Sequence, residues 1–366
     1  MQATRPETSA HDTGTRRTFH PGFFLRAGAP PAGKNLRLME SIRDKTRNRA
    51  QIPRMLKIPS FFLLSLLLVF PPSARAWDPL GHMLVMQIAE EEMTPKARQE
   101  LDAAIARFNE NDHPDAPYDA ITAGCWMDDA RAKTKEFNAW HYVNLPFTPD
   151  GTPLPEGSAE EPDVIWATRQ AVGILEGKTE MPGIDKDQAL VMLLHLAADI
   201  HQPLHTTQNN DYGGNRVRLA NLKDGQSDLV FSKGGNLHYF WDSAYRREFR
   251  DGQVATAYAP PFFRPEAPVA GHLEARKLVA REAAKLLKKY PPEAFENLAT
   301  TDPAAWAAES HAIGYNLAYG TLPSGKPIEL TPEYVEASRA AAEARIALAG
   351  HRLANLLNQL LDPAGS

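Results

Sequence analysis

The stretch "HLAADIHQPLH" at residues 195–205 decides the fold, because it combines a helical hydrophobic pattern with polar side chains that can bind a metal ion. The apolar residues leading into it repeat with a period of 3.6, which predicts a helix over 186–205. His195 and Asp199 are four residues apart, so both project from one face of that helix. His205 follows Pro203, where a helix must kink or end, and can therefore turn toward the same cleft.

A second segment, "NLHYFWD" at residues 236–242, repeats this arrangement. His238 and Asp242 are again four residues apart, a spacing that allows two side chains to bind one ion. A single His-x3-Asp pair on a helix is usually a polar pair on the surface. Two such pairs, together with a histidine beside a proline, favour metal binding instead.

Two shorter segments add further candidates: "CWMDDAR" at 125–131, with Asp128 and Arg131, and "WHYVNLP" at 140–146, with His141. Neighbouring residues point apart on a helix, so we expect only one of Asp128 and Asp129 to bind a metal. His201 lies at a different helical angle from the other candidates, and we expect it behind them or on the surface. Four isolated histidines are interpreted as ordinary residues: His113, His272, His311 and His351.

The candidate ligands are all histidine and aspartate, and this mixed nitrogen and oxygen set suits zinc. Several separate clusters indicate more than one ion. Sites with several metals and His/Asp ligands are typical of phosphate-ester hydrolysis, where the metals neutralise the phosphate and acidify a water molecule.

The rest of the chain also has a helical pattern. Thr331 and Pro332 have the chemistry of a helix N-cap followed by proline at the first helical position. A small hairpin is expected within 217–231, with its turn near Asp224 and Gly225. No repeat and no linker is present, so we predict one all-α domain over 77–366. The other predicted helices span 80–92, 95–108, 163–176, 266–289, 303–318 and 331–359.

The N-terminal part has the features of an export signal. Residues 61–70 form an apolar run that is too short to span a bilayer and matches the core of a signal peptide. We interpret 55–76 as the signal peptide, cut between Ala76 and Trp77, and 1–54 as a disordered, over-extended start. The alternative is that 61–70 is a buried core helix. Cleavage predicts a secreted or periplasmic protein without a stable membrane anchor.

Removal of this segment changes the charge balance. Residues 1–76 contain 13 Lys and Arg against 4 Asp and Glu, which leaves 27 basic and 41 acidic residues, a net charge of −14, in 77–366. A protein this acidic does not hold a polyanion by bulk electrostatics, so a phosphate-ester substrate requires local positive charge. Three Zn²⁺ ions bound by three aspartates would leave the site with the net positive charge that such a substrate requires. Cys125 is the only cysteine, so no internal disulfide can form.

Six motifs together resemble the S1/P1 nuclease family, whose members are secreted all-α enzymes with three zinc ions. These enzymes cleave single-stranded DNA and RNA, and remove 3′-phosphates from nucleotides. The resemblance covers residues 77–245 by motif and, by length and helicity, continues toward the C-terminus. It implies the phospholipase C / P1 nuclease fold, with helices around a trinuclear zinc cleft, and a monomer. The motifs are, in order, "WDPLGH", "WMDDAR", "HYVN", "HLAADIHQPLH", "DYGGN" and "NLHYFWD".

Carried over residue by residue, the resemblance implies three zinc sites. One would use Asp128, His141, His195 and Asp199. A second would use His205, His238 and Asp242. The third would use His82, Asp199 as a bridge, and Trp77 through its free α-amino group and carbonyl oxygen.

The resemblance also implies roles in binding and catalysis. The mechanism would be metal-assisted hydrolysis giving 5′-phosphate products, with Asp128 and Asp199 as catalytic metal ligands and Arg131 stabilising the charge of the transition state. Tyr142 would be an aromatic platform for a base, or else a core residue. Asn215 would orient a ligand or cap a turn. The chain departs from fungal and plant members in having no disulfide and no obvious Lys after His141.

Two other functions remain open at this point. A bacterial zinc phospholipase C shares the fold and the Trp amine ligand, but it has a longer gap between Trp and the first His and a Glu at the last ligand. Here the gap from Trp77 to His82 is five residues and the last ligand is Asp242. A non-catalytic exported zinc-binding protein would need closed coordination shells and no arginine such as Arg131 beside a ligand.

Overall fold

The computed structural model describes residues 77–115, 117–147, 161–222, 235–258 and 269–365. The expected signal peptide at 55–76 and the segment before it lie outside these residues. The described part is mainly helical, as predicted. Within it, no helix combines the length and the apolar composition needed to cross a membrane.

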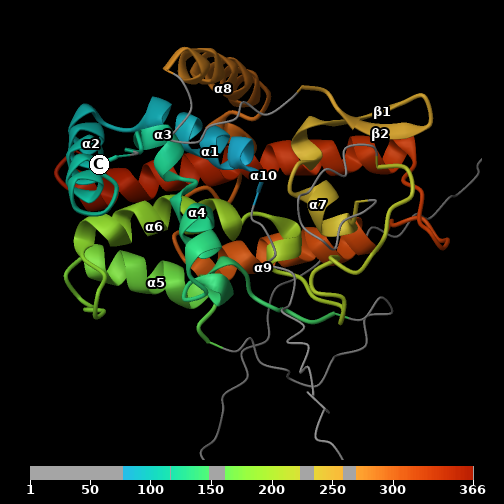
Figure 1. Cartoon of the computed structure of the whole chain (residues 1–366), viewed down its shortest axis with the longest axis horizontal. Helices are drawn as coiled ribbons and strands as arrows, with labels where there is room; N and C mark the ends of the chain where they lie inside the picture. Colours follow the sequence, from blue (N-terminus) through green and yellow to red (C-terminus); the bar gives the residue numbers. More distant parts are fainter. Residues whose placement is uncertain (1–76, 116, 148–160, 223–234, 259–268, 366) are drawn as a thin grey trace, which may run out of the picture. The chain divides into compact units, whose positions relative to one another are not determined.

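Two helices from opposite ends of the described chain form the centre of the fold (Figure 1): α1 (Pro79–Glu92) packs along α10 (Pro332–Leu361). Residues 80–90 of α1 are all buried, which is the pattern of a helix enclosed on every side. The expected cap at the start of α10 is confirmed, because the Thr331 side chain accepts a hydrogen bond from the backbone N–H of Tyr334.

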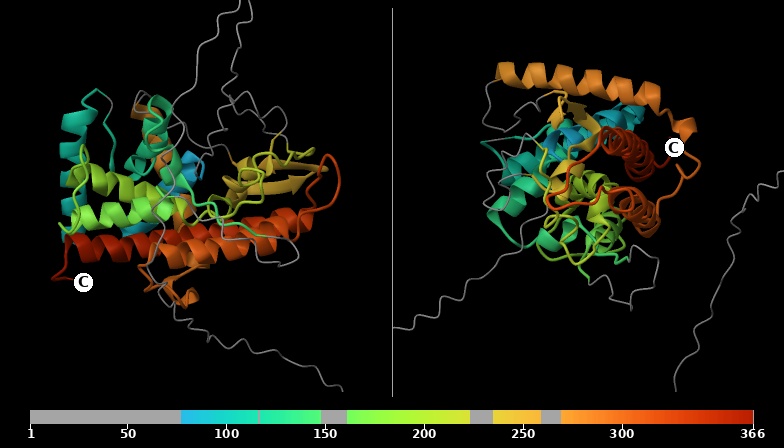
Figure 2. Two further views of the ribbon diagram at one scale, coloured as in Figure 1. Left: turned by 90° about the horizontal axis from the view of Figure 1, so that it is seen from below. Right: turned by 90° about the vertical axis from the view of Figure 1, so that its right-hand side faces the viewer.

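Further helices cover this pair on two sides (Figures 1 and 2). On one side, α8 (Val269–Lys289) packs against α1. On the other side, α6 (Lys186–Asp199) packs against α10 and α1, and α5 (Val164–Leu175) lies along α6. Every residue of α6 from 189 to 199 is buried, so its His and Asp side chains lie inside the protein.

The remaining elements are shorter or peripheral. They are α2 (Pro95–Asp112), α3 (Ala120–Ala123), α4 (Trp126–Lys133), α7 (Leu237–Trp241), α9 (Pro303–Ile313), the 3-10 turns η1 (Asn138–His141), η2 (Pro203–His205), η3 (Ala244–Arg246) and η4 (Pro292–Ala294), the π-helical turn η5 (Gly314–Tyr319), and strands β1 (Arg247–Arg250) and β2 (Gln253–Thr256).

Two predicted helices end earlier than expected. The helix predicted over 186–205 stops at Asp199, because Gln202 precedes Pro203 and takes an extended conformation with ψ of 120°. A short turn and η2 then carry the chain to His205. The helix predicted over 303–318 is α-helical only to Ile313 and continues as the π-helical turn η5.

The structure has a hairpin that was not predicted from the sequence, and the predicted one cannot be compared with it. The turn expected near Asp224 and Gly225 lies outside the described residues, and the described part of that segment makes only isolated bridges, such as Leu222 with Val254. The observed hairpin pairs β1 with β2 around Asp251 and Gly252. Both turn residues have positive φ, 51° and 74°, as a tight two-residue turn requires.

Candidate metal centre

The predicted ligands of α6 and η1 meet in the interior. His195 and Asp199 lie on one face of α6, with His195 Nε2 3.0 Å from Asp199 Oδ2. His141, at the end of η1, places Nδ1 2.9 Å from both of these atoms. All three side chains are fully buried.

The second carboxylate oxygen of Asp199 faces a different set of histidines. Asp199 Oδ1 is 3.5 Å from His82 Nε2 on α1, and 3.7 Å from His205 Nδ1 on η2, a nitrogen that lies closer to the His141 carbonyl oxygen, at 2.8 Å. One carboxylate therefore reaches ligand atoms on two sides, which is the geometry a bridging ligand needs.

Helix α4 contributes one aspartate to this centre, as expected from the spacing. Asp128 Oδ1 lies 4.0 Å from His141 Nδ1 and 2.8 Å from Arg131 Nη2. Asp129 points away, where its carboxylate accepts a hydrogen bond from the Tyr118 hydroxyl. Arg131 is nearly buried, so its guanidinium is held at the edge of the cluster.

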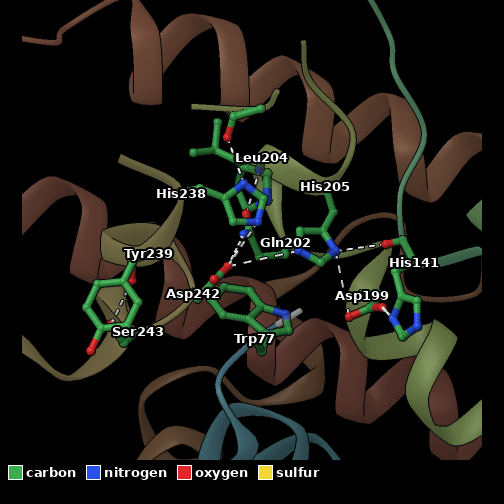
Figure 3. Close-up of polar contacts among 12 residues, drawn as sticks. Trp77, His141, Asp199, Gln202, Leu204, His205, His238, Tyr239, Asp242 and Ser243 are labelled. Carbon is green, nitrogen blue, oxygen red and sulfur yellow. Dashed lines mark hydrogen bonds and ion pairs between the residues drawn. The ribbon is translucent and has the colours of Figure 1, made fainter. Parts of the chain in front are cut away.

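The second predicted pair forms a separate group with His205 (Figure 3). Asp242 Oδ1 lies 3.6 Å from His238 Nε2 and 4.0 Å from His205 Nε2. The Gln202 side chain donates a hydrogen bond of 2.6 Å to the same aspartate oxygen. Sequence analysis missed Gln202, although its place inside the "HQPLH" motif was a usable signal.

Backbone carbonyls orient three of the histidine rings. The Nδ1 atoms of His195, His205 and His238 lie 2.7–2.8 Å from the carbonyl oxygens of Gly124, His141 and Gly213, respectively. If each Nδ1–H donates to its carbonyl, Nε2 is left as the atom that can bind a metal. Such bonds are the usual support of metal-binding histidines.

The charges and polar atoms of the centre fit metal ions. Within the described part of the chain, His82 Nδ1 and Nε2, His141 Nε2 and Asp199 Oδ1 are buried without a hydrogen-bond partner. Buried polar atoms of this kind are costly unless something binds them. Three groups have ligand atoms within 4.8 Å of one another: His82, His195 and Asp199; Asp128, His141 and His195; and His205, His238 and Asp242.

The spacing of these atoms also suits zinc. Tetrahedral zinc holds nitrogen and oxygen ligands at about 2.0–2.2 Å, which places neighbouring ligand atoms roughly 3.4 Å apart. The separations of 2.9 to 4.0 Å between His and Asp atoms in the centre bracket that value.

Burial controls the protonation of the centre. It lowers the pKa of His82 and His141 well below the usual value, and neighbouring positive groups lower both further. It also raises the pKa of Asp199 to about 6, against the opposing effect of His195. Burial lowers the pKa of His195 too, but the adjacent Asp199 carboxylate outweighs this and the net shift is upward. His82 and His141 are thus held neutral, the form that binds metals.

Trp77 lies between the two groups of ligands. Its ring is buried and donates a hydrogen bond of 2.9 Å from Nε1 to the Ala198 carbonyl, next to Asp199. The backbone N–H of Asp78 donates at 2.9 Å to the carbonyl of Asp242. In Figure 3 Trp77 lies in the space between Asp242 and Asp199.

The Asp78 side chain fixes this start of the domain. Its carboxylate caps α1 at the Gly81 N–H, accepts a 2.6 Å hydrogen bond from the Tyr245 hydroxyl, and pairs with the Arg246 guanidinium. A Cβ on Gly81 would lie 2.8 Å from the Trp77 Cβ, so glycine is needed for the close approach. Sequence analysis did not identify Asp78 as an anchor, because its partners lie more than 160 residues away.

Of the two candidate substrate-binding residues, Tyr142 adjoins a predicted ligand in the chain, and Asn215 lies on the turn whose Gly213 carbonyl contacts His238. Tyr142 follows His141 and is partly exposed. The Asn215 side chain donates a 2.8 Å hydrogen bond to the Tyr212 carbonyl, which is the turn-capping alternative. His201 lies behind the centre, where its Nε2 is 3.1 Å from Arg352 Nη1.

Similarity to known proteins identifies the family. A family model described as S1/P1 nuclease matches residues 77–362. The chain belongs to the S1/P1 nuclease family. It is 23% identical to Endonuclease 2 of Arabidopsis thaliana over 307 residues, which cover 80% of this chain and 93% of the relative. It is 24% identical over 305 residues to Endonuclease 3 of the same plant, covering 79% and 90%.

Endonuclease 1 of the same plant is 29% identical over 192 residues, which cover 48% of this chain and 56% of that protein. The S1/P1 family member described here is therefore a nuclease, a hydrolase of phosphodiester bonds, and nucleic acid is its substrate. Its clustered His and Asp residues fit the metal site on which this family depends.

Proposed function

We propose that this S1/P1 family member is a zinc-dependent enzyme that hydrolyses single-stranded DNA and RNA to products with 5′-phosphate ends, and that it removes 3′-phosphates from nucleotides. The observation that carries the proposal is the buried Asp199 carboxylate, whose Oδ2 lies beside His141 and His195 and whose Oδ1 lies beside His82. A site for one ion has no need of such a residue.

Three zinc ions would be held by nine residues. His195, His141, Asp128 and Asp199 would bind one ion, and His205, His238 and Asp242 another. His82, Asp199 and the Trp77 α-amino and carbonyl groups would bind the third. Bound zinc supplies positive charge for the phosphate and lowers the pKa of a water molecule.

The amine of Trp77 becomes available only if the chain is cut after Ala76. We therefore include export and cleavage between Ala76 and Trp77 in the proposal. Two hydrogen bonds support this part of the proposal: Trp77 donates to the Ala198 carbonyl, and Asp78 donates to the Asp242 carbonyl. They hold the start of the domain so that an α-amino group on Trp77 would lie near the predicted metal ligands.

Arg131 and Tyr142 act directly on the nucleic acid in this proposal. Arg131 is held by Asp128 at 2.8 Å with its side chain nearly buried, so it can donate hydrogen bonds to a phosphate without a large loss of side-chain freedom. Tyr142 directly follows a metal ligand and is partly exposed, which suits stacking of a base next to the scissile phosphate.

Substrate comparison with end-group analysis tests the proposed function. The purified protein should cleave single-stranded DNA and RNA faster than duplex DNA, because a paired base cannot reach an aromatic platform. The products should carry 5′-phosphates. Products with 3′-phosphates, equal rates on duplex, or turnover confined to a phosphatidylcholine analogue would overturn the proposal.

A further inference from the structure

The "DYGGN" turn at residues 211–215 touches the segments of two predicted ligands. The Gly213 carbonyl oxygen lies 2.7 Å from His238 Nδ1. A Cβ on Gly213 would lie only 2.7 Å from the Leu204 carbonyl oxygen, and Leu204 directly precedes His205. The backbone of this turn at Gly213 therefore packs against the group formed by His205, His238 and Asp242.

The turn has a defined conformation. Tyr212, Gly213 and Gly214 all have positive φ, at 59°, 59° and 84°. Such a conformation is uncommon for a tyrosine. Hydrogen bonds hold it: the Asp211 carboxylate accepts from the Gly214 N–H and from the Tyr319 hydroxyl, both at 2.9 Å, and the Asn215 side chain donates to the Tyr212 carbonyl.

The turn presents an aromatic ring to solvent. Tyr212 is 42% exposed, and the guanidinium carbon of Arg216 lies 4.1 Å from the centre of its ring. Arg216 is itself exposed, and its guanidinium lies over one face of the Tyr212 ring. The other exposed large apolar side chains in the described ranges are Tyr315, at 38%, and Leu273, at 59%.

Tyr315 lies on an element that is bonded to the same turn. It belongs to η5, whose Tyr319 donates to Asp211. The Tyr315 ring packs 6.1 Å from Phe147 and 6.0 Å from His311, measured between ring centres. Tyr212 and Tyr315 thus lie on two elements that the hydrogen bond from Tyr319 to Asp211 joins.

We propose that Tyr212 and Arg216 form a nucleotide-binding subsite that holds a base and a phosphate of the substrate strand next to the His205 group. This inference rests on the proposed function. The tyrosine face offers stacking to any base, and the planar guanidinium beside it can donate two hydrogen bonds to a phosphate. With a net charge of −14 over residues 77–366, a local arginine adds positive charge where this surface would meet a polyanion.

Four variants separate stacking, charge and folding. Tyr212→Asn removes the ring and keeps a residue that tolerates positive φ, whereas Tyr212→Phe keeps the ring. Arg216→Gln removes the charge. Leu273→Ala is the matched control, because it truncates an exposed apolar side chain on α8. Zinc content and the unfolding midpoint of each variant show whether the fold is retained.

The assay compares kcat/KM on a thymidine octanucleotide with kcat/KM on methyl 4-nitrophenyl phosphate, a diester without bases. Stacking on an aromatic ring contributes enough per base that Tyr212→Asn should lower kcat/KM on the octanucleotide by about 5- to 150-fold. The small diester should be cleaved as fast as by the wild type. Tyr212→Phe and Leu273→Ala should match the wild type on both substrates.

Salt dependence tests the role of Arg216. For single strands the slope of log affinity against log salt falls by about 0.7 for each phosphate that the protein no longer neutralises, so Arg216→Gln should reduce the slope by this amount. An unchanged octanucleotide rate in Tyr212→Asn, or an equal decrease on both substrates, would overturn the subsite alone. A wild-type protein that cleaves neither substrate would overturn the proposed function, and the subsite with it.

Discussion

Replacement of Asp199 by Asn should remove more metal than the same replacement at Asp242. Asparagine has nearly the same shape as aspartate but no charge, so the change acts on metal binding rather than on packing. In the structure Asp199 reaches His141 and His195 through Oδ2, at 2.9 and 3.0 Å, and His82 through Oδ1, at 3.5 Å. Asp242 faces only the group of His205 and His238.

The magnitude follows from the number of ions that each aspartate would bind. Loss of a residue that merely supports a ligand costs about 10- to 100-fold in metal affinity, or about 1.4 to 2.7 kcal/mol, and this is a lower bound for a ligand itself. Asp242→Asn should therefore weaken the binding of one zinc ion by at least this factor. Asp199→Asn should weaken the binding of two zinc ions, and the two factors multiply. At limiting zinc, the fraction of enzyme that holds all its ions should therefore fall by about 10²- to 10⁴-fold.

The assay is zinc content and kcat/KM after dialysis against a buffer of fixed free zinc. We expect loss of one ion in Asp242→Asn, of two ions in Asp199→Asn, and of none in Asp129→Asn. Asp129 is the matched control because it is adjacent to Asp128 but bonds to Tyr118 outside the cluster. Equal activity losses in Asp199→Asn and Asp242→Asn, with full metal retention in both, would refute the bridging assignment.

Three other changes have defined outcomes. A version with one residue retained before Trp77 converts its amine into an amide, a far poorer ligand, so elemental analysis should find it short of one zinc relative to protein that begins at Trp77. Gln202→Leu removes the 2.6 Å hydrogen bond to Asp242 and should lower the affinity of that site for zinc by about 10- to 100-fold, as measured by chelator competition. His351→Gln should flatten the pH dependence of stability. Burial lowers the pKa of His351, but its bonds to Glu92 and the Tyr290 carbonyl outweigh this and raise it. Its contribution to the free energy of unfolding should thus be complete below about pH 6.5 and disappear as pH rises through the folded-state pKa. Denaturant titration of both proteins at several pH values checks the sign, and a difference that grows with pH would contradict it.

Local spacing predicted which candidate side chains lie together, because four-residue separation on a helix fixes a shared face. His195 with Asp199 and His238 with Asp242 lie as that rule requires. The same local chemistry predicted the cap at Thr331.

Features that depend on distant residues could not be predicted in this way. The carbonyls of Gly124 and Gly213 that orient the histidines have no side-chain signature, and the partners of Asp78 are brought to it only by the packing of α1. The hairpin of β1 and β2 was not predicted, although Asp251 and Gly252 at its turn form the same Asp-Gly pair that predicted a turn at 224–225.

Anomalous diffraction at the zinc edge, on protein processed to begin at Trp77, tests the central claim most directly. We expect three peaks, two of them within about 2.0–2.2 Å of the Asp199 carboxylate oxygens and the third within that distance of Asp242. A single peak, or three peaks with none bound to Asp199, would contradict a trinuclear zinc centre built around this residue.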